Sequence, residues 1–99
     1  MTKHIRQGDL LITKVDKIPS GLKKDLTGII LFGEATGHKH QLFGGDVFKG
    51  KEGLIFLNVP KKAEIRHEEH RTIKLGAGKF AVIRQREYLN SDMVKLVVD

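Results

Sequence analysis

The chain has 99 residues, of which 39% are hydrophobic and 30% charged, a composition typical of a folded domain with one modest core. It contains no cysteine, which excludes disulfides, thiolate nucleophiles and cysteine-based zinc or iron–sulfur sites, so a metal would need His, Asp or Glu ligands. The net charge of +6 favours polyanionic partners over basic ones, and it equally suits a surface that only keeps the protein soluble.

Short apolar segments separated by turn signals predict an all-β domain, either a small barrel or a sandwich, spanning residues 1–99 as one unit. At most one short helical turn is expected, at 22–26, and 61–70 is ambiguous between a strand and a short helix after Pro60. In chain order, the expected strands are 9–15, 28–33, 40–48, 54–59, 63–67, 72–75, 80–87 and 93–98.

The apolar pattern also indicates where the core lies. Residues 29–32 and 54–57 are apolar at consecutive positions, which predicts strands covered on both faces. The apolar run at 93–98 has no following partner strand, so at a sheet edge it would pair with a second copy of the chain and form a homo-oligomer. No signal-like leader and no stretch of about 18 apolar residues is visible, so we expect a cytoplasmic protein without a membrane segment.

The functional signal is a pair of histidine motifs. In a strand, side chains two positions apart point the same way, so His38 and His40 are expected to direct both imidazoles to one place. His67 and His70 are three apart, and they share a face only if a turn, bulge or helical turn falls between them. We expect the two motifs to meet at the barrel mouth.

Three interpretations of this cluster remain open. The first is a site in which His38, His40, His67 and His70 bind a divalent transition metal, zinc, manganese, iron or nickel. The metal would act on a phosphate-containing substrate, a class that includes fragments of nucleic acids. The second is metal-free acid–base cleavage of a phosphodiester by paired imidazoles. The third is a non-catalytic basic module that binds RNA, DNA or a protein, with histidines that only tie loops together.

Charged neighbours would support the catalytic interpretations. Glu68 or Glu69 would accept a proton from water, and Lys39 or Arg71 would stabilise the developing negative charge. Two polar segments at strand ends, Gln7–Asp9 and Arg84–Tyr88, are candidate binding surfaces at the rim of the sheet. Because the five Phe residues fall mostly in apolar strands, an exposed platform for stacking bases is not expected.

Several segments resemble known families. Gly33–His40 (GEATGHKH) and His67–His70 (HEEH), together with Arg6–Leu11 and Leu75–Tyr88, are similar to a family of small uncharacterised bacterial proteins. The His-x-His pair also resembles part of the metal motif of cupins, which implies a cupin-like or jelly-roll-like barrel, although Gly44 and Gly45 stand where the cupin carboxylate is expected. His70–Ile73 resembles one unit of the two-histidine phosphoesterases, and the second unit is lacking.

Overall fold

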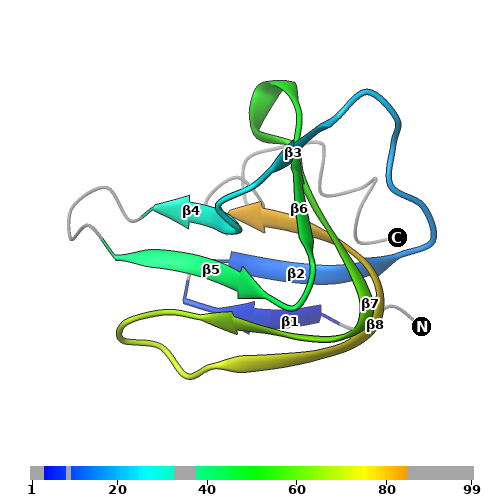
Figure 1. The fold of residues 1–99 in the computed structure, drawn as a ribbon. Coiled ribbons are helices and arrows are strands. Elements are labelled where there is room, and N and C mark those ends of the chain that lie inside the picture. The colour runs from blue at the N-terminus through cyan, green and yellow to red at the C-terminus, as the bar shows by residue number, and fades with distance from the viewer. Residues whose placement is uncertain (1–3, 9, 33–37, 85–99) are drawn as a thin grey trace.

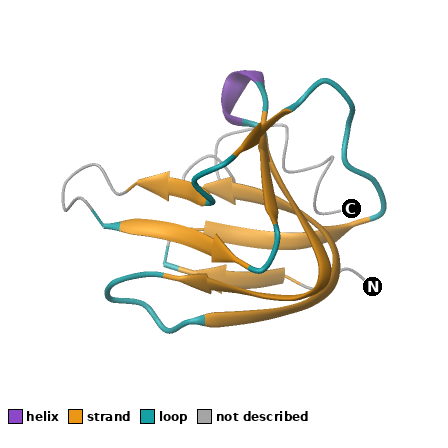
Figure 2. Ribbon diagram, viewed as in Figure 1, coloured by secondary structure: helices purple, strands orange, loops and turns teal. Residues whose placement is uncertain are grey.

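The computed structural model describes residues 4–8, 10–32 and 38–84, and it forms one curled antiparallel sheet (Figures 1 and 2). The strand order is β1-β2-β8-β7-β5-β4, while β6 pairs with β7 and with β3. The elements are β1 (His4–Gln7), β2 (Leu10–Val15), β3 (Lys23–Asp25), β4 (Ile29–Phe32), β5 (Lys39–Phe43), β6 (Asp46–Lys49), η1 (Lys51–Gly53), β7 (Ile55–Arg66) and β8 (Ile73–Arg84). The all-β prediction is therefore confirmed.

Strands β7 and β8 are the longest elements, and they give the sheet its curl. Each has 12 residues and bends sharply, so that the first half of β7 pairs with β6 and its end pairs with β5 (Figure 1). The register between β7 and β8 shifts between Val59 and Lys62. Pro60 lies inside this shift, where its missing N–H interrupts the ladder at little cost. The separate strands expected at 54–59 and 63–67 are therefore one bulged strand, and 72–75 joins 80–84 in the same way.

The strand expected at 40–48 is instead two strands, β5 and β6, in which the chain turns through a bend at Gly44 and Gly45 and both strands stay antiparallel to β7. Gly44 has φ +96, and a Cβ there would lie 2.7 Å from the Lys62 carbonyl oxygen. A Cβ on Gly45 would lie equally close, 2.7 Å, to the carbonyl oxygen of Asn58. Both glycines are thus needed for the close approach of this turn to β7. The turn lets one apolar segment supply β5 and β6, which contact successive parts of β7.

Some local predictions were wrong. β1 and β3 were not expected, and the helical turn expected at 22–26 is the short strand β3 followed by a turn, in which Asp25 accepts from the Thr27 backbone N–H. The ambiguous segment 61–70 is strand up to Arg66 and bends after it. Among the described residues, η1 is the only helical element. The expected strand at 93–98, and with it the proposed edge pairing, lies outside the described residues.

The core lies inside the curl of the sheet. Ile30, Val47, Leu57 and Ile65 are buried there together with Leu10 and Ile12 from β2. On β8, Phe80 and Val82 join this core, whereas Ala81 and Ile83 are buried on the opposite face, as the alternation in the sequence indicated. Within the described residues, no helix is long and apolar enough to cross a membrane.

Candidate functional site

The two histidine motifs meet at one end of the curled sheet, where β5 begins and β7 turns into β8 (Figure 1). The ring centroid of His67 lies 4.4 Å from that of His40, 4.4 Å from that of His70 and 5.5 Å from that of His38. His40 and His70 are 6.3 Å apart, with nearly parallel rings. The four rings, which we call the histidine cluster, therefore converge, as the metal and acid–base interpretations both require.

His40 is the buried member of the cluster, and Gln7 fixes its orientation. Its side chain is 4% exposed, and its Nδ1 lies 2.8 Å from Oε1 of Gln7, which is itself buried. The amide nitrogen of Gln7 donates to the carbonyl oxygens of Ile65 and Arg71, at 2.9 and 2.8 Å. Those carbonyls can only accept, so the Gln7 oxygen faces His40, and Nδ1 of His40 must carry the hydrogen. In neutral His40, Nε2 therefore holds the lone pair.

His67 has the opposite tautomer. Its Nδ1 accepts from the backbone N–H groups of Glu69, at 3.0 Å, and of His70, at 3.1 Å. Nδ1 must therefore be unprotonated, and in the neutral ring Nε2 carries the hydrogen. These bonds also form the bend that brings His70 onto the same side as His67, which the three-residue spacing could not achieve on a straight strand.

Gly8 makes room for His70. It has φ +59, and a Cβ built there would lie 2.6 Å from His70 Nε2 and 2.8 Å from its Cδ2. The imidazole therefore lies directly over the backbone at Gly8, and only glycine combines that contact with the left-handed conformation without strain. Gln7 and Gly8 thus position two different histidines from one turn, between β1 and β2.

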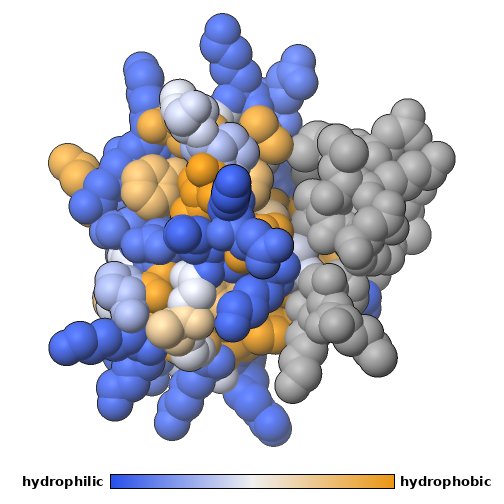
Figure 3. All heavy atoms as spheres, turned by 90° about the vertical axis from the view of Figure 1, so that its right-hand side faces the viewer, coloured by the Kyte–Doolittle hydropathy of each residue, from blue (hydrophilic) through white to orange (hydrophobic). Residues whose placement is uncertain are grey.

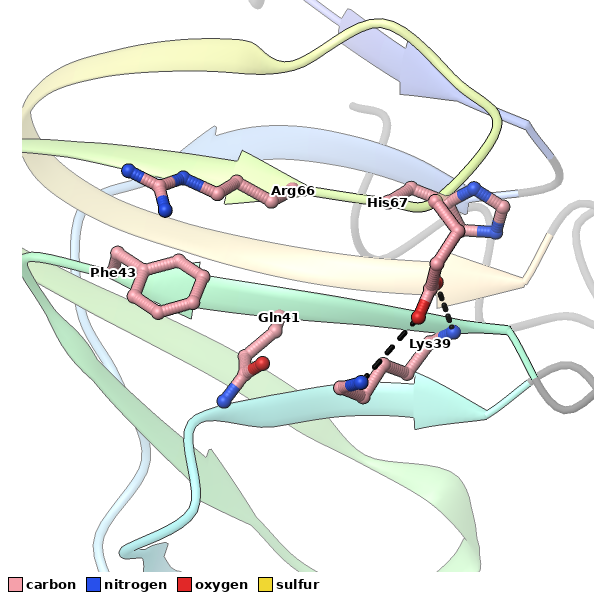
Figure 4. Close-up of a pocket in the computed structure, with 6 residues that line it drawn as sticks. Lys39, Gln41, Phe43, Arg66 and His67 are labelled. Atoms are coloured by element: carbon pink, nitrogen blue, oxygen red, sulfur yellow. Dashed lines mark hydrogen bonds and ion pairs between the residues drawn. The ribbon is translucent and has the colours of Figure 1, made fainter.

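Carboxylates of the HEEH segment join this end of β7 to the start of β5. Glu69 Oε1 lies 2.6 Å from His38 Nδ1, so that nitrogen donates to the carboxylate. Glu68 accepts from the backbone N–H of Lys39, at 2.8 Å, and pairs with its Nζ at 3.3 Å (Figure 4). The two expected proton acceptors therefore already hold His38 and the start of β5.

Electrostatics favour a neutral His67 and an ionised Glu68. Burial lowers the pKa of His67, and the neighbouring charges of His70 and His38 lower it further. The pKa of Glu68 falls to about 2, mainly because its carboxylate accepts the Lys39 backbone N–H. At neutral pH the site therefore combines an imidazole that resists protonation with a carboxylate that remains charged.

The other residues predicted for the site lie beside the cluster or outside the described part of the chain. Arg71 is exposed beside the cluster, and its backbone carbonyl accepts from Gln7. Among the residues that the structure describes, no three His, Asp or Glu side chains form a ready-made metal-binding group. Of the two candidate binding surfaces, Asp9 and residues 85–88 lie outside the described part of the chain. The role of Gln7 and Gly8 in the cluster was not predicted, although the sequence marked their segment as polar at a strand end.

Comparison with known proteins assigns a family. Residues 6–85 match the family described as a domain of unknown function (DUF8820). The chain belongs to this family. No match was found among curated proteins or among solved structures. The DUF8820 match supports the expected membership in an uncharacterised family, and it covers all four histidines of the cluster together with Gln7 and Gly8.

Proposed function

We propose that the histidine cluster binds a divalent transition metal, zinc, manganese, iron or nickel, and uses it on a phosphate-containing substrate. The observation that supports this most strongly is the bond from His40 Nδ1–H to the buried Gln7 oxygen. Metal-binding histidines commonly donate their second ring N–H to an oxygen acceptor, which fixes the tautomer and aims the other nitrogen. A neutral imidazole fixed in this way is a ligand that all four metals accept.

The four histidines fit this role unequally. His38 has the same arrangement as His40, because its Nδ1 donates to Glu69 and its Nε2 is left as the basic nitrogen. His70, held over Gly8, is the third proposed ligand. His67 does not fit as an Nε2 ligand in its present tautomer, because both backbone bonds are made to Nδ1. We assign it instead the role of an N–H donor to an oxygen of the substrate.

A metal bound there would lower the pKa of a coordinated water and polarise a phosphoryl oxygen. Glu69, which is largely exposed, would accept the proton of that water through the side of its carboxylate away from His38. Arg71 would supply positive charge to the phosphate. Glu68 and Lys39 neutralise each other and would mainly keep β5 in place.

Metal titration of untagged protein, followed by isothermal calorimetry and elemental analysis, tests the binding step. We expect one equivalent of metal for the natural chain, and at least a tenfold loss of affinity for His38→Gln and for His70→Gln. His67→Asn is the matched control, because an Asn oxygen two residues before Glu69 accepts the same backbone N–H and preserves the bend. Failure of the natural chain to hold stoichiometric metal would refute the proposal.

A second candidate is metal-free acid–base catalysis on a phosphodiester, and the opposite tautomers of His40 and His67 favour it. One ring has its lone pair on Nε2 and the other has its hydrogen there, while their centroids lie 4.4 Å apart. A base and a hydrogen-bond donor at that separation suit proton removal with stabilisation of the developing oxyanion. The test is cleavage of a panel of phosphodiester substrates. If the cleavage activity persists in the presence of a chelator and is lost in the His67→Asn variant, metal-free catalysis becomes the preferred function.

A further inference from the structure

The outer face of the sheet beside the cluster carries a row of polar and aromatic side chains. On β5, Lys39, Gln41 and Phe43 alternate with the buried His40 and Leu42, so they project outward (Figure 4). Phe43 lies opposite Glu64 on β7, which lies opposite Lys74 on β8. The row therefore crosses three strands on the face away from the core.

Two open hollows follow this row, and Phe43 stands between them. The first, of about 240 Å³, extends from Phe43 and Arg66 to Lys39 and His67, so it ends at the histidine cluster (Figure 4). The second, of about 310 Å³, extends from Phe43 to Lys62 and Lys74. Both hollows have Phe43 in their lining, so they adjoin there, and we call the two together the outer track, which extends from the β7–β8 bend to His67.

The middle of the outer track is a platform of two flat side chains, in which Arg66 lies over the Phe43 ring. The Arg66 guanidinium carbon lies 4.4 Å from the centre of the Phe43 ring, and Glu64 Oε1 accepts from Arg66 Nε at 3.1 Å and from Nη2 at 2.8 Å. Phe43 is 39% exposed, an exception to the expectation that the phenylalanines are covered. An aromatic ring and a fixed guanidinium plane form a surface on which a nucleobase stacks.

The far end of the outer track is basic. Lys62 and Lys74 line it, and neither forms an ion pair within the described residues. Lys74 also lines a neighbouring hollow with Lys14, and Lys14 lines a third with Lys79. Figure 3, which faces the bend, shows hydrophilic side chains projecting across this side of the molecule. In contrast, Lys24, Lys39 and Lys49 are paired with carboxylates.

We propose that the outer track binds a single-stranded nucleic acid. One base stacks at Phe43 and Arg66, and flanking phosphates contact Lys62 and Lys74. A single strand fits better than a duplex because stacking needs a base face that pairing would hide, and better than a membrane surface because the track presents a planar platform between charges. The strand leads to His67, and this delivery of a phosphodiester to the cluster rests on the proposed function, whereas binding itself does not.

Fluorescence anisotropy with labelled single-stranded RNA and DNA of about 12 nucleotides tests the proposal, because single-strand sites span about 4–16 nucleotides. Phe43→Leu and Arg66→Lys should each weaken binding roughly tenfold. The first substitution removes the aromatic ring, and the second keeps the positive charge but removes the planar guanidinium group. Lys62→Gln with Lys74→Gln should reduce the slope of log affinity against log salt by about 1.4, the value for two phosphate contacts on a single strand.

The matched control is Lys23→Gln with Lys51→Gln, which removes the same charge from exposed positions on β3 and η1. It should leave affinity within about twofold, because these lysines lie outside the track. Equal losses from the two double variants would overturn the proposal. So would an unchanged affinity in Phe43→Leu, equal binding of a duplex of the same sequence, or equally tight binding to phosphatidylserine vesicles.

The same measurements separate this inference from the proposed function. All binding is measured in chelator, with circular dichroism confirming that each variant is folded. If strands bind but the protein holds no metal and cleaves nothing, only the proposed function fails. If metal binds with the expected dependence on His38 and His70 but no strand binds, the outer-track proposal fails and the metal site stands.

Discussion

The histidine cluster has two halves that are held in different ways. The strand half, His40 on β5 and His38 just before it, depends on long-range contacts, because His40 is buried and bonded to Gln7, 33 residues earlier. In the turn half, His67 is half-buried and His70 is exposed, and the shape of this half comes from local bonds between His67 Nδ1 and the next backbone N–H groups. The strand half is therefore held by the folded core, and the turn half is a locally hydrogen-bonded bend attached to that core.

This difference predicts which substitutions act on the whole fold and which act on the site alone. Gln7 touches both halves, since its oxygen holds His40 and its nitrogen holds the Arg71 carbonyl at the end of the turn. Gly8 touches only the turn half, through His70. Glu68 joins the two halves at the surface.

Replacing Gln7 should have the largest effect. Gln7→Ala leaves His40 Nδ1 and two backbone carbonyls without their partner in a buried place, so we expect the free energy of unfolding to fall by about 3 kcal/mol. Urea unfolding measures this loss. Gln41→Ala is the control, because its single bond to the Thr27 carbonyl is exposed and should cost under about 1 kcal/mol. Equal losses for the two variants would contradict the central place given to Gln7.

Gly8→Ala should damage the turn half specifically. Its left-handed backbone costs an alanine about 1 kcal/mol, and the new methyl group pushes the His70 ring out of the cluster. Gly21→Ala is a matched control, because Gly21 has φ +88 with nothing within 4 Å of a Cβ. Both variants should lose similar stability, but only Gly8→Ala should shift the His70 ring resonances in NMR spectra and weaken metal binding. Undisturbed His70 resonances would refute the contact.

Two substitutions at His67 distinguish its role in the shape of the turn from the chemical role of its ring. His67→Ala removes the acceptor for two backbone N–H groups, so we expect a loss of about 1 kcal/mol in unfolding free energy. His67→Asn supplies a side-chain oxygen to the Glu69 N–H and should restore most of that loss, while it removes the ring. Thermal unfolding compares the two. If Asn is no more stable than Ala, the backbone bonds to Nδ1 do not support the bend.

The same division explains how much of the site the sequence predicts. The two-residue period of a strand alternates Phe80 and Val82 with Ala81 and Ile83, so this feature follows from local pattern. The same period does not account for His38, because β5 begins only at Lys39. The meeting of β5 with the end of β7 depends on a sheet register that no short segment specifies. Gln7 could not be assigned to His40 because its partners lie 33, 58 and 64 positions away.

The fold shows a similar limit at its turns. Gly44 and Gly45 were recognised as turn residues, but an apolar pattern on both sides made one strand look continuous across them. Pro60 and the lysines after it suggested a turn, and the structure has a bulge within β7 instead. Both signals mark an interrupted ladder: β5 and β6 on either side of Gly44 and Gly45 pair with different parts of β7, and β7 on either side of Pro60 continues to pair with β8.

The link through Glu68 should have the smallest effect, and it should depend on pH. The pKa of Glu68 in the folded protein is lowered from 4.5 to about 2, so the folded state favours the ionised carboxylate. The stability that it contributes is fully present above pH 4.5 and is lost as pH falls toward 2. In metal-free protein, Glu68→Gln should therefore be slightly less stable than the natural chain at pH 6, and this difference should vanish in acid.

Lys39→Met then identifies which bond links the two halves. The backbone N–H of Lys39 is the largest cause of the lowered Glu68 pKa, and this substitution retains it while removing the ammonium group. Most of the pH-dependent difference between Glu and Gln at position 68 should therefore persist in the Lys39→Met background, as measured by paired urea unfolding curves. If that difference disappears, the exposed ion pair rather than the backbone bond holds the turn half against β5, and added salt should then weaken the link as strongly as acid does.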